Sequence, residues 1–167
     1  MNRIEPSQKV LSPVKKSVAV GLPVEAAFRL FTEGIDQWWP LATHSVGGED
    51  AEAVYLEGLV GGRIYEVLKD HSQSEWGRVL AWEPPERLVF SWYPGRTPST
   101  AQEVEVTFSP EAGGTRIELI HRGWELLGGR AQAMRNAYDS GWVEVLGKYA
   151  AFTAFSNTAF NGSPKMS

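Results

Sequence analysis

The sequence predicts a single α+β domain in which a curved antiparallel sheet surrounds one long C-terminal helix. Two observations support this fold class. Segments that alternate polar and apolar residues follow one another from residue 53 to residue 122, separated by short turns. Apolar residues then recur every three or four positions from Ala131 to Phe152. A sheet with one solvated face has to cover the other face, and only the last helix is long enough to do so.

The N-terminal part of the chain predicts one strand and two short helices. Residues 14–20 are rich in valine and lie between a proline and a glycine, which is typical of a strand. Apolar residues recur at helical spacing from Val24 to Phe31, and Gly34 ends this first helix. Residues 35–39, followed by a proline, indicate a second short helix.

Six further strands follow, and short loops between consecutive strands make them antiparallel. Their expected bounds are 53–58, 63–69, 74–83, 87–93, 103–109 and 115–122. The dipeptide Pro84-Pro85 marks a corner between two of them, because proline cannot donate a hydrogen bond inside a central ladder.

The final helix is amphipathic and spans roughly 25 residues, more than twice the average length. Gly141 and Gly147 interrupt it, and close packing against the sheet is the expected reason. After residue 156 the apolar pattern disappears. We therefore expect a flexible N-terminal arm at residues 1–13, one helix-and-sheet domain at 14–156 and a frayed tail at 157–167.

Alternation along the strands predicts which side chains face the helix. The inward sets are Leu88, Phe90 and Trp92 in one strand, Val104, Val106 and Phe108 in the next, and Thr115, Ile117, Leu119 and His121 in the last. The strand at 74–83 remains undecided, because both of its faces are half apolar. Its alternatives are Trp76, Arg78, Leu80 and Trp82, or Gly77, Val79 and Ala81.

Composition excludes several classes of function. The formal net charge of −4 argues against a nucleic-acid partner, which requires a basic surface. There is no cysteine, so disulfides and thiolate chemistry are excluded. His44, His71 and His121 match no metal-ligand spacing, and we expect neither a metal nor a cofactor. No apolar run has the length of a membrane span or signal peptide, so we expect a cytoplasmic protein without membrane insertion.

Aromatic residues are abundant, with seven tryptophans, seven phenylalanines and five tyrosines. Rings that face inward from a curved sheet can line an apolar cavity, or they can fill a solid core. The candidate ligand-binding residues are Trp39, Phe90, Trp92, Val106, Leu119, His121, Trp124, Tyr138 and Trp142.

Only a few residues offer chemistry. His121 is expected to face inward as a polar anchor or acid–base group, or else to hydrogen-bond backbone at the start of the helix. Glu57 and Glu66 lie on adjacent strands and either approach one another in the cleft or form solvated strand faces. The glycine-rich segment 58–62 joins two strands and lacks the Lys-Ser/Thr of a phosphate loop, so a tight turn is expected.

The segment from Trp76 to Trp92, WGRVLAWEPPERLVFSW, resembles the central signature of proteins related to the C-terminal domain of the activator of heat-shock protein 90 ATPase. Segments 61–63, 114–123 and 141–146 are similar to the same family, so the resemblance covers roughly residues 14–155. That family is part of the START-like (SRPBCC) superfamily with the helix-grip fold. Its relatives include lipid-transfer domains, plant hormone receptors and polyketide cyclases, which share a cavity between sheet and helix.

Three functional hypotheses follow. The first is binding of a hydrophobic or aromatic small molecule in the sheet–helix cavity. The second, implied by the resemblance alone, is a co-chaperone-like or stress-related interaction module that contacts a chaperone or another copy of itself. The third is a cyclase- or dehydratase-like enzyme that uses His121 with Glu57 or Glu66. We rank binding first, because no pattern places a second catalytic group beside His121.

Overall fold

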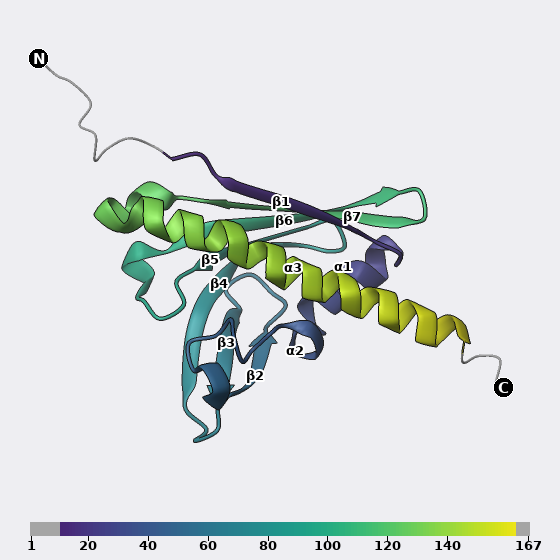
Figure 1. The fold of residues 1–167 in the computed structure, drawn as a ribbon, viewed down its shortest axis with the longest axis horizontal. Coiled ribbons are helices and arrows are strands. Elements are labelled where there is room, and N and C mark those ends of the chain that lie inside the picture. The colour runs from purple at the N-terminus through teal and green to yellow at the C-terminus, as the bar shows by residue number, and fades with distance from the viewer. Residues whose placement is uncertain (1–10, 163–167) are drawn as a thin grey trace, which may run out of the picture.

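A strongly curled sheet lies against the long C-terminal helix in the computed structural model of this chain (Figure 1). The structure describes the backbone of residues 11–162 and the side chains of residues 11–154. The strands are β1 Val14–Val20, β2 Ala51–Leu56, β3 Arg63–Leu68, β4 Gln73–Glu83, β5 Arg87–Trp92, β6 Gln102–Glu111 and β7 Gly114–Arg122. The helices are α1 Val24–Thr32, α2 Ile35–Trp38 and α3 Ala131–Gly162, with short 3₁₀ segments at Gly48–Asp50, Pro98–Thr100 and Trp124–Arg130.

The predicted fold class and order of elements are confirmed. All expected strands are present, with ends within two residues of the expected bounds. The end of α3 was predicted wrongly, because residues 157–162 are helical rather than part of a frayed tail. The apolar pattern reports which residues are buried, whereas the backbone hydrogen bonds of a helix do not require buried side chains. Residues 1–10 of the expected arm and 163–167 of the expected tail lie outside the described residues.

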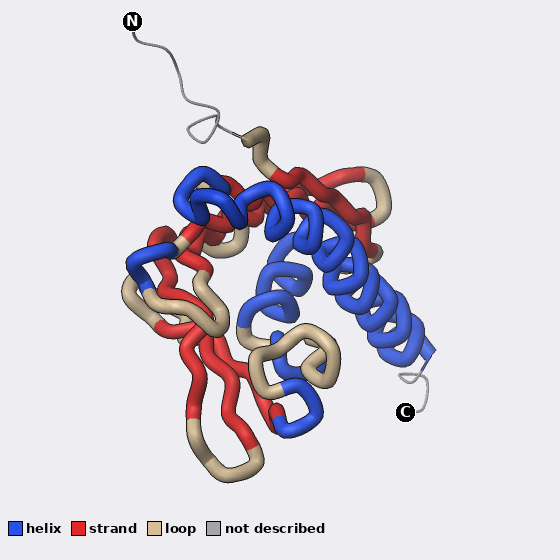
Figure 2. The backbone as a smooth tube through the Cα atoms, turned by 60° about the vertical axis from the view of Figure 1, so that its left-hand side comes forward, coloured by secondary structure: helices blue, strands red, loops and turns tan. Residues whose placement is uncertain are grey.

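The sheet has seven antiparallel strands in the order β1-β7-β6-β5-β4-β3-β2. β1 joins the far edge by pairing with β7, from Val14 opposite His121 to Val20 opposite Thr115. The strands at the β1 end run roughly along α3, whereas β2, β3 and β4 run across it (Figure 1). The tube view shows the same curl, with α3 on one side of the molecule and the β2–β4 region extending away from it (Figure 2). None of the helices in the described part of the chain is long and apolar enough to cross a membrane.

Strand β4, whose inward face the sequence left undecided, interrupts the regular alternation of its side chains at two positions. Irregularities in its pairing with β3 and β5 leave one extra residue at Trp76 and one at Leu80. A bulge of this kind shifts the face on which the following side chains lie. As a result Trp76 and Val79 are both buried, and Trp82 is opposite the inward residue Leu88, while Leu80 is exposed. Neither of the two expected inward sets is correct as a whole.

The inward assignments for β5, β6 and β7 are confirmed, since every residue of the three predicted sets is buried. The opposite face of the same strands carries charged pairs. Glu105 on β6 accepts hydrogen bonds from Arg87 on β5 at 2.7 Å and from Arg122 on β7 at 2.6 Å. Arg122 also contacts Glu103 at 2.8 Å. This alternation of apolar and charged faces determines which side of the sheet α3 covers.

α1 and α2 complete the core at the end of the sheet where α3 leaves it. Phe31 of α1 contacts Tyr149 of α3 and Phe108 of β6, with ring centroids 5.2 and 5.6 Å apart. The Tyr149 hydroxyl donates a hydrogen bond to the Ala27 carbonyl at 2.7 Å, and its burial raises the pKa of this phenol. Tyr149 therefore anchors the later part of α3 to α1. The earlier part of α3, around Tyr138 and Trp142, forms one wall of a pocket.

The sharp bend of β4 predicts that Gly77 cannot be replaced. A Cβ atom at this position would lie 1.8 Å from the Ser91 carbonyl oxygen on β5, closer than any real contact. We expect Gly77→Ala to lower the free energy of unfolding by about 2 kcal/mol or more, because the two strands have to separate. Urea denaturation measures this change. Gly147→Ala in α3 is the control, and it should raise stability by about 0.5–1 kcal/mol. A neutral effect of Gly77→Ala would contradict this account of the bend.

Candidate functional site

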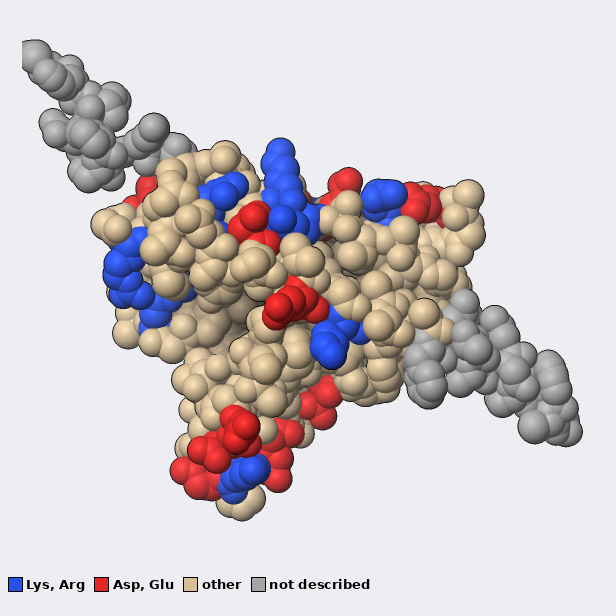
Figure 3. Space-filling view, viewed as in Figure 1, with Lys and Arg blue, Asp and Glu red and all other residues tan. Residues whose placement is uncertain are grey.

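A pocket of about 400 Å³ lies between α3, the ends of β4 and β5, and the loop that follows α2. Its walls are aromatic and consist of Trp39, Trp76, Trp92, Tyr138 and Trp142. Its rim consists of Thr43, His44, Ser45 and Val46 from the loop, and of Pro94 and Gly95 after β5. Gly141 and Val145 of α3 complete the lining. The space-filling view shows a recess beside α3 that is bordered mainly by uncharged residues (Figure 3).

The four tryptophans of the wall form one contiguous cluster. Trp39 has its ring centroid 5.2 Å from that of Trp76 and 6.1 Å from that of Trp142. Trp92 lies between the others, 5.7 Å from Trp76 and 5.6 Å from Trp142. These separations are typical of favourable ring–ring contacts, so each ring is held in place by its neighbours. The wall is therefore formed before any ligand arrives.

Four of the nine candidate ligand-binding residues lie in the wall of this pocket, namely Trp39, Trp92, Tyr138 and Trp142. The other five are buried in the core and do not line it, namely Phe90, Val106, Leu119, His121 and Trp124. The sequence analysis missed Trp76 and the whole rim. Trp76 lies in the strand whose alternation is broken, and the rim residues lie in loops, where there is no periodicity to follow.

His121 is buried at the end of β7, and both of its ring nitrogens are engaged. The Trp142 indole can only donate, and it donates to Nδ1 at 2.9 Å. Nε2 therefore carries the proton and donates it to the Gln102 side-chain oxygen at 2.9 Å. Burial, with a smaller effect of the positive charge on Arg96, lowers the pKa of His121 to about 3. The imidazole is thus a neutral connector between β7, β6 and α3, with no nitrogen left for a ligand.

The surroundings of His121 support this structural role. The Trp124 indole donates to the His121 backbone carbonyl at 3.0 Å, and the two rings stack with centroids 4.1 Å apart. The sequence also allowed His121 to hydrogen-bond backbone at the start of the helix. Its ring instead pairs with the side chains of Gln102 and Trp142. By holding the Trp142 indole, His121 fixes the orientation of one wall of the pocket from behind.

Glu66 on β3 is completely buried and holds the rim loop in place. Its two carboxylate oxygens accept hydrogen bonds from the backbone N–H groups of Val46 and Gly47, both at 2.8 Å. The Trp76 indole donates to the same carboxylate. A buried carboxylate is tolerated only where donors replace water. This group therefore joins the sheet, one wall ring and the loop into a single unit.

Two further contacts shape the rim loop. The Trp39 indole donates to the His44 carbonyl at 2.8 Å. The Ser45 hydroxyl donates to the Leu41 carbonyl and accepts a hydrogen bond from the Gly48 backbone N–H at 2.9 Å. The loop thus has a fixed conformation and holds the His44 side chain at the mouth of the pocket.

Glu57 and Glu66 do not form the carboxylate pair that was considered from the sequence. Glu57 accepts hydrogen bonds from the backbone N–H of Arg63 at 2.8 Å and from its guanidinium at 3.4 Å. The Arg63 backbone bond, reinforced by its side chain, keeps the pKa of Glu57 below its usual value. Glu66 is instead surrounded by N–H donors of the loop and Trp76. Of the expected solvated strand faces neither is found, because Glu66 is buried and the partly exposed Glu57 lies just beyond the end of β2.

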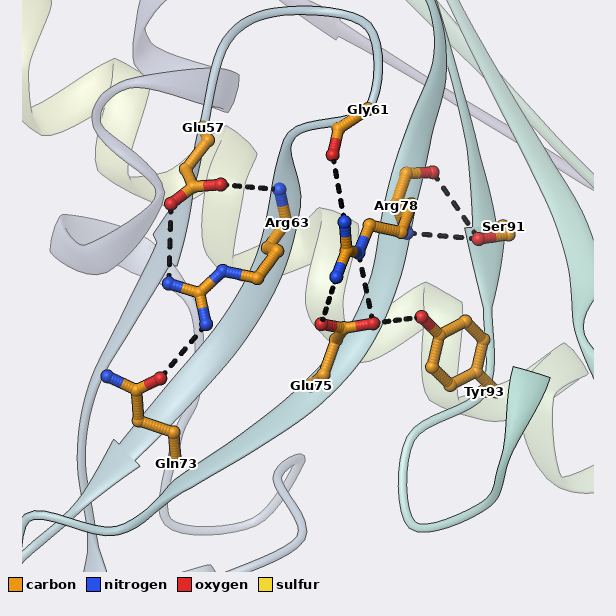
Figure 4. A network of polar contacts seen from close by, with 8 residues as sticks. All are labelled: Glu57, Gly61, Arg63, Gln73, Glu75, Arg78, Ser91 and Tyr93. Carbon is orange, nitrogen blue, oxygen red and sulfur yellow. Dashed lines mark hydrogen bonds and ion pairs between the residues drawn. The ribbon is translucent and has the colours of Figure 1, made fainter.

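A second polar network lies next to Glu57 on the other side of the strands from α3 (Figure 4). Arg78 donates to Glu75 at 3.1 Å and to the Gly61 carbonyl at 3.3 Å. The Tyr93 hydroxyl also donates to Glu75, and burial together with this bond raises the pKa of Tyr93 to about 12. Gly61 itself belongs to the tight turn between β2 and β3, in agreement with the sequence analysis. None of the residues in this network lines the pocket, and we assign it to the stability of the sheet.

The two glycines of α3 do not have the close packing that was expected for them. A Cβ atom at Gly147 would meet nothing within 4 Å, and one at Gly141 would meet only the His44 ring, at 4.0 Å. Gly141 instead lies in the pocket lining, where its missing side chain leaves space.

The comparison with known families agrees with this fold. The model of the family described as "Activator of Hsp90 ATPase homolog 1-like protein" matches residues 21–152. The chain belongs to this family. Its helix-grip architecture is that of the START-like superfamily. No curated protein sequence matches the chain.

Several solved structures resemble this member of the Activator of Hsp90 ATPase homolog 1-like family. An anthrahydroquino-γ-pyrone synthase, Txn09, solved in complex with SUM, is 35% identical, with a TM-score of 0.55 over 81% of this chain and 90% of that chain. Protein NE0264 from Nitrosomonas europaea is 13% identical, with a TM-score of 0.63 over 93% and 99%. DynU16, a protein from the dynemicin biosynthetic locus, is 19% identical, with a TM-score of 0.64 over 85% and 47%. At such identities the last two show the fold alone.

Removal of the buried carboxylate should destabilise the protein strongly. Glu66→Ala leaves the Val46 and Gly47 N–H groups and the Trp76 indole without an acceptor. An unsatisfied buried donor costs about 1–3 kcal/mol, so we expect the free energy of unfolding to fall by about 3 kcal/mol or more. Urea denaturation tests this. The control is Glu118→Ala on the exposed face of β7, which should change stability by less than about 0.5 kcal/mol. Equal effects of the two substitutions would be inconsistent with the role of Glu66.

Burial of His121 should make the protein sensitive to acid. The unfolded chain binds a proton at this residue below pH 6.5, whereas the folded chain does so only below about 3. The contribution of neutral His121 to stability is therefore complete above pH 6.5 and is lost as the pH falls towards 3, at up to about 1.4 kcal/mol per pH unit. Denaturation of wild type and His121→Gln across this range measures it. The stability difference between them should shrink on acidification, and a constant difference would show that His121 does not titrate in this way.

Proposed function

We propose that this protein binds a flat hydrophobic or aromatic small molecule in the pocket between the sheet and α3. The observation that carries the proposal is the contiguous wall of four tryptophans and Tyr138 around a cavity of about 400 Å³. Ligand sites in proteins commonly measure about 300–1,000 Å³ and combine apolar walls with a few polar groups. The faces of stacked indoles favour a flat ring system, since such rings gain both burial and ring–ring contact.

The polar groups around the pocket are few and lie mostly at its mouth. They include the Tyr138 hydroxyl on α3 and the side chains of Thr43 and His44 on the rim. Tyr138 packs against His121 and Trp142, with ring centroids 5.0 and 6.3 Å away. A ligand with an apolar body and one or two oxygen atoms matches this distribution, because its rings enter the tryptophan wall and its oxygens remain near the rim.

A second candidate function is ring-closing catalysis on an aromatic ligand. One specific observation favours it, namely the 35% identity to a protein named as an anthrahydroquino-γ-pyrone synthase, over 90% of that chain. The catalytic group considered from the sequence, His121, has both nitrogens engaged and is buried. Catalysis of this kind would therefore depend on groups at the rim. The co-chaperone hypothesis rests on the name of the family.

A side chain added at Gly141 should block the pocket. Gly141→Leu places four carbons beside the His44 ring and in front of the tryptophan wall. We expect the dissociation constant of a hydroxyanthraquinone dye such as alizarin to rise by about tenfold or more, which corresponds to about 1.4 kcal/mol. Quenching of tryptophan fluorescence by the dye measures binding, because four of the seven tryptophans line the pocket.

Gly147→Leu is the matched control for this experiment. It places the same side chain on the same helix, in open space and outside the pocket lining. We expect wild-type affinity for this variant. Equal dye affinity of the two variants, or the absence of saturable quenching in the wild-type protein, would refute binding in this pocket.

A further inference from the structure

Three polar side chains contact one another in a row at the mouth of the pocket, through one hydrogen bond and one close imidazole–carboxylate contact. The Thr43 hydroxyl and the His44 Nδ1 atom are 2.8 Å apart, and both residues belong to the rim loop. On the other side of the ring, His44 Nε2 lies 3.1 Å from a carboxylate oxygen of Glu144 on α3. The His44 imidazole thus links the rim loop to α3 at the mouth of the pocket.

The partners of His44 determine which nitrogen carries its proton. The Glu144 carboxylate can only accept, so its contact with Nε2 at 3.1 Å favours the neutral tautomer that carries the hydrogen on Nε2. Nδ1 then has a free lone pair and accepts the hydrogen bond of the Thr43 hydroxyl. That hydroxyl also has a second acceptor, since the Pro40 carbonyl lies 3.4 Å away. When a ligand hydroxyl approaches Nδ1, Thr43 can turn away without losing its only partner.

His44, like His121, has a partner at each ring nitrogen, but its Nδ1 partner is a hydroxyl with a second acceptor and its side chain is partly exposed. Its side chain is 20% exposed and lies in the pocket lining, whereas His121 is fully buried behind the wall. The backbone around His44 is rigidly held, because Trp39 binds its carbonyl and Glu66 binds the next two residues of the loop after Ser45. The charged groups that face it are Glu144 and Lys148 from α3, with Glu66 behind the loop.

We propose that His44 takes the proton of a phenolic hydroxyl on the ligand in this pocket, with Glu144 as the positioning residue that favours the Nε2–H tautomer and leaves the Nδ1 lone pair to the ligand. This inference rests on the proposed function and specifies its ligand as a phenol-bearing aromatic molecule. In the step, the ligand O–H bond breaks and the proton forms a bond with Nδ1. The ligand oxygen becomes a phenolate, and the imidazole becomes a cation that pairs with the Glu144 carboxylate next to Nε2. No electrons are exchanged with another reagent.

Such a step would have a chemical use. A phenolate is a stronger nucleophile than a phenol, so ionisation of the bound ligand prepares its oxygen to attack a carbon of the same molecule. The apolar wall keeps water away from the rings, which strengthens the attraction between the phenolate and the imidazolium. Without a subsequent reaction, the same arrangement of His44 and the tryptophan wall selects phenols over other aromatic ligands, because His44 accepts the phenolic proton.

The test uses alizarin, a three-ring phenol whose colour changes on ionisation. It is bound to the full-length protein at a pH below the pKa of the free dye, and the absorbance of the bound dye gives the ratio of phenolate to phenol. Removal of an opposite charge within a few ångströms typically changes such an equilibrium by a factor of ten or more. We therefore expect this ratio to be about tenfold or more lower in His44→Gln than in the wild-type protein.

Two further variants separate proton transfer from a structural effect. Glu144→Gln replaces an exposed carboxylate on α3, so it should leave thermal stability unchanged while it lowers the phenolate ratio towards the His44→Gln value. His71→Asn changes a histidine in the turn between β3 and β4, where asparagine tolerates the left-handed backbone, and should leave the ratio unchanged.

The outcomes distinguish this inference from the function on which it rests. Equal phenolate ratios in wild type and His44→Gln, with dye binding retained in both, would overturn the role of His44 and leave ligand binding intact. Lack of dye binding to the wild-type protein would overturn both. A lower ratio in His44→Gln and Glu144→Gln, with unchanged His71→Asn, would support the proton transfer.

Discussion

The pocket depends on one buried carboxylate. Glu66 lies on β3 without access to water, and a charge in such a place has to be surrounded by donors. Its three donors come from the rim loop and from Trp76. Because these donors have to reach one carboxylate, Glu66 fixes the rim loop and Trp76 relative to β3. The shape of the pocket mouth follows from these fixed positions.

The curl of the sheet supplies the second constraint. The two irregularities in β4 allow Val79 to face the interior together with Trp76 and Trp82, although regular alternation would place Val79 on the opposite face. Gly77 makes the bend possible through its close approach to the backbone of β5. The sheet turns away from α3 at this point. The strands at the β1 end lie along the helix, whereas β2, β3 and β4 diverge from it, and the pocket lies between them and α3.

The two histidines near the pocket show how the surroundings decide what one residue type can do. His121 is held between an indole donor and an amide acceptor, and burial keeps it neutral. His44 has a carboxylate on one side and a hydroxyl on the other, at a partly exposed rim. His121 orients Trp142 from the core side of the wall, and His44 lies at the mouth of the pocket. The tryptophan wall and the partly exposed imidazole thus come from different parts of the molecule.

The sequence alone determined the order of the elements, the inward faces of β5, β6 and β7 and the apolar stripe of α3, because each follows from local periodicity. It also placed Trp39, Trp92, Tyr138 and Trp142 at the cavity. Only the tertiary structure decided the remainder of the site. The Glu66 contacts and the His44–Glu144 contact join residues about ten to a hundred positions apart, and Trp76 faces inward next to a bulge. Such contacts depend on how elements pack, and no repeat in the sequence encodes them.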